Sequence, residues 1–334
     1  MSRVGGLRTT ALSFPAGLTI PRLHLLIAAA LLALYVVVAI RPERVFGSYD
    51  AWAIWNVKAR AIYFHGFDII RNPIFHHPDY PPLLPVIEAG LLKVFGDTPY
   101  VFVAVQGGLL AALLLIPRWK WWTLLIVGVI AVQYALHQYA DLFIALMVLI
   151  SAILYEKKRP LLLGISLGIC LFVKNEGMVI ALAFLLMQIL VERKLPLRTM
   201  AALIPFAFGL ALYKAWVGAP SEFFDDGSLQ RALDLSRQQL LIPYMFATAF
   251  LHFNFAVPVV LVISLLKGIR LRLTPLLIVC FLTLVGYWAT YTITPLDLGW
   301  HLEMSYDRLL FHILPTIVYA VGQLPTNSLR KVTT

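Results

Sequence analysis

The side chains able to do chemistry in this chain of 334 residues lie in short polar segments between long apolar stretches. Asp50, Asp79 and Asp141 are carboxylates that can accept a proton or bind a polar ligand. His76 and His77 closely precede Asp79, and carboxylate with imidazole suits divalent ions. One interpretation is therefore a metal site for Mg²⁺ or Mn²⁺, built from Asp79, His76 and His77 with Asp50 or Asp141.

Basic side chains near the apolar stretches are candidates for binding phosphate. Arg308, in WHLEMSYDR, precedes the last apolar stretch, and its guanidinium can hold phosphate oxygens in two places. The alternative for Arg308 is snorkelling to a membrane interface. In VKNEG, Lys174 either pairs with Glu176 across a tight turn or meets a phosphate.

The carboxylates also have a purely structural interpretation as helix caps. Ser48 can cap the helix that follows it, with Asp50 complementing the helix dipole. Asp141 can likewise cap the apolar helix that begins beside it. From spacing alone, both interpretations stay open.

The composition is that of a membrane protein: 60% of the residues are apolar, 13% are charged, and the mean hydropathy is +0.83. The net charge of +10 is explained by Lys and Arg in cytoplasmic loops, so we expect lipid phosphate and no nucleic acid as the acidic partner. Cys170 and Cys280 fall inside apolar stretches and are predicted to be small core residues. The stretch 23–40 has no small-residue cleavage site and is interpreted as a retained signal anchor.

The hydropathy pattern predicts an all-α, multi-pass membrane protein with about ten transmembrane helices, since about 20 residues cross a bilayer. With the N- and C-termini in the cytoplasm, every predicted inner loop carries Lys or Arg. Only Glu156 and Glu192 of the 17 acidic residues then lie inside. The predicted spans are 23–40, 99–116, 121–136, 142–155, 161–173, 178–191, 197–217, 243–266, 273–293 and 309–324.

The sequence predicts a single transmembrane domain over 1–334, without a separate soluble domain. Its outer polar segments are 41–98, 218–242 and 294–308. Within the first, 48–64 has the pattern of an amphipathic helix with Trp on its apolar face, and 83–96 is too short to span. Both are predicted to be juxtamembrane helices in the interface.

Two tight outer turns, at 137–141 and 174–177, join short predicted helices. The turns carry His, Asp, Lys and Glu. Ionisable groups at membrane depth are costly and face wet cavities where they occur. We therefore expect these turns to line a polar cavity on the outer face.

Four segments in this order resemble the GT-C superfamily of membrane glycosyltransferases. The resemblance covers most of the chain and is closest to bacterial aminoarabinose transferases, protein O-mannosyltransferases and lipopolysaccharide-core galacturonosyltransferases. In that superfamily a first span is followed by a long outer loop with an acid near its start. The segments are SYDAWAIWNVKARAI at 48–62, HHPDYPPLLP at 76–85, YADL at 139–142 and WHLEMSYDRLL at 300–310.

The resemblance implies transfer of a sugar from a polyprenyl-phosphate donor to a glycan, lipid or other envelope acceptor. It places the reaction on the outer, periplasmic face of a bacterial inner membrane. Asp50 matches the acid of the first loop and would be the general base. Trp300 either stacks on a sugar or belongs to the interfacial aromatic belt. Residues implied in binding donor or acceptor are Asp79, Tyr80, Asp141, Lys174, Glu176, Trp300, His301, Glu303 and Arg308.

Two other classes of protein fit the hydropathy pattern. A transporter or flippase of a lipid-linked sugar would place charges near helix centres, often in paired repeats. The predicted helix centres are nearly free of charge and no internal repeat is visible. A non-catalytic envelope-assembly protein is the second alternative, and the sequence does not separate it from an enzyme.

Overall fold

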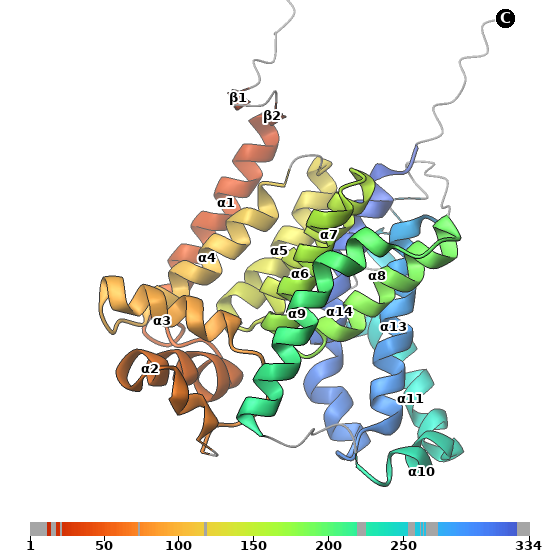
Figure 1. Cartoon of the computed structure of the whole chain (residues 1–334). Helices are drawn as coiled ribbons and strands as arrows, with labels where there is room; N and C mark the ends of the chain where they lie inside the picture. Colours follow the sequence, from red (N-terminus) through yellow and green to blue (C-terminus); the bar gives the residue numbers. More distant parts are fainter. Residues whose placement is uncertain are drawn as a thin grey trace, which may run out of the picture.

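The computed structural model describes residues 12–14, 18–20, 22–72, 74–116, 119–218, 225–252, 258–260, 262, 264 and 273–325. Two short strands, β1 (Leu12–Phe14) and β2 (Leu18–Ile20), pair in an antiparallel hairpin. The other regular elements in these residues are helices (Figure 1). The predicted all-α class is therefore confirmed, with the small hairpin as an addition.

A bundle of helices follows the apolar stretches closely. Of the ten predicted spans, eight coincide with one helix each within two residues at either end. These eight are α1 (Arg22–Ala39), α4 (Tyr100–Leu114), α5 (Trp121–His137), α6 (Asp141–Glu156), α7 (Pro160–Val173), α8 (Gly177–Glu192), α9 (Leu197–Val217) and α13 (Pro275–Ile293). The last predicted span, 309–324, is the second part of α14 (Leu298–Gln323).

Three of these helices, α1, α9 and α13, are long and apolar enough to cross a membrane. Of the most apolar 18-residue segment of α9, only 17% is buried inside the protein, so most of its apolar side chains face outward. Such an apolar surface fits contact with lipid. The helices α4, α5, α7 and α8 are apolar but shorter. A membrane protein is supported by these lengths, whereas the predicted number of about ten spans is not confirmed.

The predicted juxtamembrane segments are helical and pack together. Residues 48–64 contain a π-helix, η1 (Ala51–Trp55), which continues into α2 (Asn56–His65). A 3-10 helix, η2 (Phe67–Arg71), follows this segment. Residues 83–96 form α3 (Leu83–Phe95), which packs on α2 through a small apolar cluster. Figure 1 shows α2 and α3 at the end of the bundle opposite to the start of α1. Their place at a membrane interface stays a prediction.

The predicted loop conformation of 294–308 is wrong, because α14 already begins at Leu298, whereas the outer position of this segment stays a prediction. Asp297 caps this helix by accepting a hydrogen bond from the backbone N–H of Trp300 at 2.8 Å. The polar residues 300–308 hid the helix from the hydropathy pattern. As a result, α14 runs for 26 residues, about 39 Å, and one continuous helix contains both the polar residues 300–308 and the apolar stretch that follows.

The segments 218–242 and 243–266 also differ from their predicted form. The former contains α10 (Ser228–Leu233) and most of α11 (Leu235–Ala247), where a loop was expected. The predicted span 243–266 begins inside α11 and continues into the π-helix η3 (Thr248–His252); much of its remainder lies outside the described residues. Asp234 caps α11 by accepting from the backbone N–H of Ser236 at 2.9 Å. Because Asp234 caps it, α11 begins at Leu235, before the predicted apolar span at 243.

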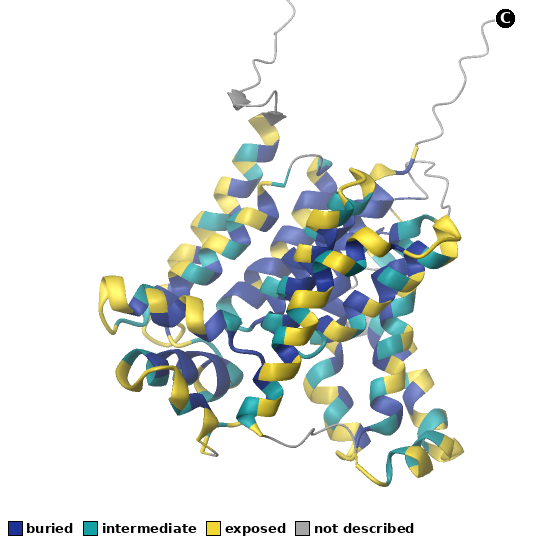
Figure 2. Cartoon of the chain, viewed as in Figure 1, coloured by how far each residue is buried: buried dark blue, intermediate teal, exposed yellow. Residues whose placement is uncertain are grey.

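The core of the bundle is centred on α6, which is almost entirely apolar between Asp141 at its start and Glu156 at its end. A helix that is apolar all round is buried among other helices. Ten of its residues are buried, and α14 and α7 pack on it. Figure 2 shows the buried residues concentrated in these central helices, while α9 and α1 carry many exposed ones. The N-terminus of α6 bears Asp141, so the core helix leads directly to the candidate site.

Candidate functional site

The centre of the candidate site is Asp141, the first residue of α6, whose side chain is completely buried. Its Oδ1 accepts hydrogen bonds from Lys174 Nζ at 3.0 Å and His312 Nε2 at 2.7 Å. Its Oδ2 accepts two more from Arg308, from Nε at 3.2 Å and Nη2 at 3.0 Å. Four donors thus surround one buried carboxylate, and their hydrogen bonds offset the free-energy cost of removing its charge from water.

Arg308 also joins Asp141 to Asp50. Its Nη1 donates to Asp50 Oδ2 at 2.6 Å, so one guanidinium holds two carboxylates from distant parts of the chain. The guanidinium lies over the ring of Tyr139, 4.3 Å from its centroid, a cation–π contact. We call Asp50, Asp141, Lys174, Glu176, Arg308 and His312 the Asp141 cluster.

Helix capping does not explain these acids. Asp50 makes no side-chain hydrogen bond to the helix that follows it, and the Ser48 hydroxyl is bonded to His137 Nδ1 instead. The oxygens of Asp141 are taken by side chains rather than by the backbone of α6. The predicted caps by Ser48 and Asp141 are therefore wrong, whereas the favourable interaction of Asp50 with the helix dipole stays a prediction. The common partner of both acids is Arg308.

Two local features of the fold position the cations. Arg308 and His312 are four residues apart on α14, so they lie on one face of that helix, one turn apart. Lys174 stands in an extended conformation at the end of α7. The chain then turns sharply into α8, and a Cβ on Gly177 would lie 2.2 Å from the carbonyl oxygen of Cys170. Only glycine fits there, so the turn that presents Lys174 depends on Gly177.

The predicted ion pair of Lys174 and Glu176 is present at 2.9 Å. Burial by itself lowers the pKa of Lys174, but the neighbouring Asp141 and Glu176 carboxylates outweigh it and raise that pKa. Burial likewise tends to raise the pKa of Glu176, and the adjacent Lys174 ammonium brings it below its ordinary value. Both groups are therefore charged at neutral pH, with Lys174 held between two carboxylates.

A second polar cluster lies around Asp79 in the proline-rich turn. Asp79 Oδ2 accepts from Asn175 Nδ2 at 2.9 Å and from Lys214 Nζ at 3.3 Å, and Lys214 also donates to Asn175 Oδ1 at 2.9 Å. The Tyr213 hydroxyl lies 2.9 Å from the carbonyl oxygen of Tyr80 and 3.1 Å from that of Pro78, both acceptors. Because Lys174 belongs to one cluster and Asn175 to the other, the turn after α7 joins them.

The aromatic and imidazole groups of the first loop lie beside this second cluster. Tyr80 stacks on the His77 ring, with centroids 4.6 Å apart, and lies 5.7 Å from Trp55. His76 is exposed. The Lys58 ammonium donates to the backbone carbonyl of His77 and lies over the Tyr80 ring. Tyr80 is thus part of a packed aromatic group next to Asp79.

The predicted metal site is not assembled in the part of the chain that the structure describes. No group of three or more His, Cys, Asp or Glu side chains there is close enough to hold an ion. The candidate ligands are divided: Asp50 and Asp141 bind Arg308, whereas Asp79 binds Asn175 and Lys214. These residues do not fit a metal ion in this arrangement, and we derive no step through one.

Three further candidates, Trp300, His301 and Glu303, lie on the first two turns of α14 outside the Asp141 cluster. Trp300 is 55% exposed and Glu303 is also exposed. His301 packs edge-on against Tyr291 at 4.8 Å. Burial lowers the pKa of His301 to about 4, so this side chain is neutral at physiological pH. The helix places these groups one to two turns before Arg308.

The sequence analysis missed His312, Lys214 and Asn175. His312 lies within the predicted apolar stretch 309–324, and its Nδ1 accepts from the Tyr287 hydroxyl at 2.9 Å while Nε2 donates to Asp141. An ionisable residue inside an apolar stretch is itself a signal of function, and it applies to Lys214 as well. Asn175 carries no charge, and nothing in the sequence distinguishes it from an ordinary turn residue.

No family model, no curated protein and no solved structure matches this chain.

Proposed function

We propose that this protein is a membrane glycosyltransferase of the GT-C type. It moves a sugar from a polyprenyl-phosphate donor to an envelope glycan or lipid, on the outer face of a bacterial inner membrane. The observation that carries the proposal is the bridge made by Arg308, which holds Asp50 beside Asp141. Three of the four GT-C-like segments contribute these residues. The fourth, with Asp79, is joined to them through the turn at Lys174 and Asn175.

Asp50 is the carboxylate best suited to act as general base. Its side chain is 23% exposed, and Oδ1 makes no hydrogen bond within the described part of the chain. The Asp141 cluster holds three carboxylates against the two cations Lys174 and Arg308, with His312 neutral. The excess negative charge is reachable from solvent at Asp50. A base must lie within hydrogen-bond reach of the hydroxyl that it deprotonates, and only an accessible oxygen meets that condition.

In the proposed reaction the acceptor hydroxyl oxygen forms a bond to the anomeric carbon of the donor sugar. The bond between that carbon and the phosphate oxygen breaks, and its electron pair leaves with the lipid phosphate. The hydroxyl proton passes to Asp50. Arg308, with its side chain 16% exposed beside Asp50, supplies positive charge for the departing phosphate.

Asp141 acts as a positioning residue in this scheme. Its oxygens are occupied by Lys174, His312 and Arg308, so they are not available to an acceptor hydroxyl. The carboxylate fixes the plane of the Arg308 guanidinium through two hydrogen bonds. It thereby sets the position of Nη1, the atom that holds Asp50.

The test is sugar transfer by the purified full chain in nanodiscs, with radiolabelled polyprenyl-phosphate sugars and isolated envelope glycans and lipids as acceptors. We expect Asp50→Asn to lower the transfer rate by about 10²- to 10⁴-fold. The matched control is Asp97→Asn, which removes a carboxylate from an exposed pair with Arg60 and leaves the rate unchanged. Transfer by Asp50→Asn at the wild-type rate would contradict the assignment of the base. Movement of a lipid-linked sugar across proteoliposomes without transfer would favour a flippase.

The proposed topology is tested by labelling single cysteines in intact cells. Asp97 follows α3, and Lys157 follows α6 at the opposite end of the bundle. We expect a membrane-impermeant maleimide to label Asp97→Cys from outside and Lys157→Cys only after permeabilisation. The native Cys170 and Cys280 are buried and give little background. Labelling of both variants from outside would contradict the topology.

A further inference from the structure

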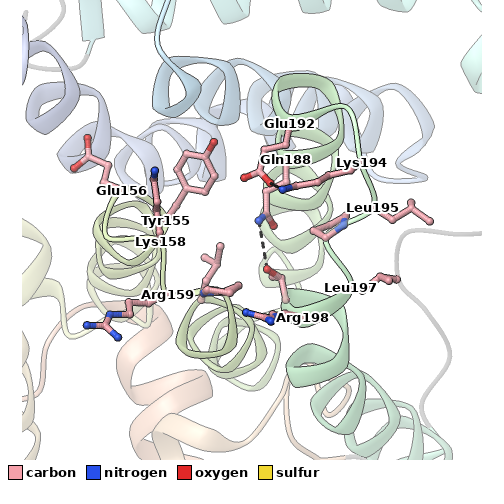
Figure 3. A pocket seen from close by; sticks show the side chains of 14 residues that line it. Tyr155, Glu156, Lys158, Arg159, Gln188, Glu192, Lys194, Leu195, Leu197 and Arg198 are labelled. Carbon is pink, nitrogen blue, oxygen red and sulfur yellow. Dashed lines mark hydrogen bonds and ion pairs between the residues drawn. The ribbon is translucent and has the colours of Figure 1, made fainter.

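A second polar site lies at the far end of α6. A cavity of about 830 Å³ opens between the C-terminal ends of α6 and α8 and the N-terminal ends of α7 and α9 (Figure 3). Glu156 at the cavity is fifteen positions after Asp141, a distance of about 22 Å along α6. The cavity is thus remote from the Asp141 cluster, and a ligand there would be distinct from the proposed sugar donor.

The charges around this cavity favour an anion. Lys158, Arg159, Lys194 and Arg198 line it together with two acids, Glu156 and Glu192. Both acids have partners: Lys194 lies 3.6 Å from Glu192, and the Tyr319 hydroxyl donates to Glu156 at 2.9 Å.

The cations Lys158 and Arg198 have no carboxylate partner in the part of the chain that the structure describes. In Figure 3 Lys158 and Arg198 come from opposite sides of the cavity, whereas Arg159 is directed away from its centre. Two cations therefore remain available to a ligand between them.

The N-terminus of α9 reinforces this positive end. Its first turn has no acidic residue and no side chain bonded as a cap, and its residues Arg198 and Thr199 line the cavity. The helix α7 also begins there, but its first residue, Pro160, has no N–H group to offer. The first N–H groups of a helix lack partners within the helix, and with the helix dipole they attract anions. The backbone therefore adds to the field of Lys158 and Arg198.

A buried amide points to the second feature of the ligand. Gln188 lines the cavity, is only 4% exposed, and donates from Nε2 to the Thr199 hydroxyl at 3.3 Å. Its Oε1 is buried and accepts no hydrogen bond from the described residues. An unsatisfied buried acceptor is costly, and a ligand hydroxyl would supply the missing donor.

The wall that carries Gln188 and Thr199 is closely packed. A Cβ on Gly164 of α7 would lie 2.3 Å from the carbonyl oxygen of Thr199, so glycine allows α7 and α9 to touch. Thr199 is fully buried at this contact. The backbone of α9 thus places Thr199, the partner of Gln188, and a small turn of the Gln188 side chain would bring Oε1 to the cavity.

We propose that this cavity binds a polyol phosphate, a phosphate ester with a neighbouring free hydroxyl. Lys158, Arg198 and the N-terminus of α9 bind the phosphate, and Gln188 Oε1 accepts from the hydroxyl. The glycerol headgroup of an anionic phospholipid and a soluble glycerol or sugar phosphate share this chemistry.

The test measures binding to the purified full chain in detergent, by native mass spectrometry and by the shift in thermal unfolding. The probes are phosphatidylglycerol, phosphatidylcholine, and glycerol 1-phosphate. We expect phosphatidylglycerol or glycerol 1-phosphate to bind with a Kd below about 1 mM. Binding of the lipid alone identifies a membrane headgroup as the source, and equal binding of the soluble ester identifies a free metabolite. Binding of neither probe, or equal binding of phosphatidylcholine, would overturn the proposal.

Matched variants locate the site. We expect Lys158→Gln with Arg198→Gln to weaken binding by about tenfold or more, since each change removes a charge-assisted hydrogen bond. The control pair, Lys157→Gln with Arg193→Gln, removes two charges that do not line the cavity. Each pair also includes one residue in a left-handed backbone conformation, Lys158 with φ of 53° and Arg193 with φ of 51°. Equal weakening by both pairs would show general charge attraction and overturn the site.

A separate variant tests the amide. Gln188→Leu keeps the size of the side chain and removes Oε1. We expect it to abolish the preference for phosphatidylglycerol over phosphatidic acid, an anionic lipid whose headgroup has no glycerol hydroxyl, while charge-dependent binding of both lipids remains. If the preference is unchanged in Gln188→Leu, the hydroxyl contact is wrong.

Discussion

Two buried acids in different regions of this molecule show opposite ways to place a carboxylate in an apolar interior. Asp141, in the bundle, and Glu88, in α3, are both completely buried. Asp141 accepts four hydrogen bonds from charged and imidazole donors. Both oxygens of Glu88 are buried without a hydrogen bond in the described part of the chain, and burial raises its pKa well above the ordinary value.

The two acids therefore differ in ionisation: Asp141 stays charged, whereas Glu88 is protonated and neutral. A buried carboxylate is tolerated either ionised with enough donors or protonated and neutral. The bundle takes the first course at the Asp141 cluster, and the layer of α2 and α3 takes the second at Glu88. Asp141 therefore contributes a fixed negative charge to its surroundings, whereas Glu88 contributes none.

The largest expected effect of a single substitution on stability is that of Asp141→Asn. The amide leaves Lys174 and Arg308 with one carboxylate fewer in a buried setting, and breaking such a pair costs about 3–5 kcal/mol. The measurement is the free energy of unfolding in detergent. Asp50→Asn is the matched control, since its partly exposed carboxylate allows water to solvate Arg308. Equal losses for both variants would contradict the central place of Asp141.

Glu88→Gln is expected to become more stable relative to the wild type as the pH rises. Above the ordinary pKa of a glutamate, the unfolded chain releases this proton while the folded protein keeps it. Wild-type stability therefore falls by up to about 1.4 kcal/mol per pH unit, until the raised pKa of the folded state is reached. Glu88→Gln has no ionisable group at this position and therefore lacks this pH dependence of stability.

The measurement for Glu88 is the stability difference between variant and wild type from pH 5 to pH 8. The buried amide has a desolvation cost that does not depend on pH, so the slope of the difference carries the result. We expect the difference to move in favour of Glu88→Gln as pH rises. A flat difference would show that Glu88 is ionised in the folded protein, and the contrast with Asp141 would fail.

A smaller effect is expected for Asp79→Asn. The Lys214 side chain is 33% exposed, so water can solvate its ammonium after the carboxylate is lost. We expect a loss of about 1–3 kcal/mol, in the range of a hydrogen bond to a charged group. The measurement is again unfolding in detergent, beside Asp141→Asn. A loss as large as that of Asp141→Asn would show that both clusters are equally dependent on buried charge.

The sequence predicted the positions of most helices because the apolar stretches that define them are long and uninterrupted. It failed at 294–308, where the first three turns of α14 are polar and hydropathy carries no helical signal. The cap at Asp297, three residues before Trp300, was the available clue to that helix.

The candidate site could be predicted only as a set of separate residues. Asp50, Asp141 and Arg308 were each identified by type and position. The contact of both aspartates with the Arg308 guanidinium depends on the packing of α14 against α6, which single-sequence patterns do not specify. His312 was missed because hydropathy treats it as part of an apolar stretch.

The turn at Gly177 has a consequence for mutational screening. This residue has no functional group, yet any side chain there would push α7 and α8 apart. Such a shift would move Lys174 away from Asp141 and Asn175 away from Asp79 together. A screen for lost activity would therefore score Gly177 among the most sensitive positions. Sensitivity there would report the geometry of the backbone, so a map of intolerant positions in this protein is not a map of its reacting groups.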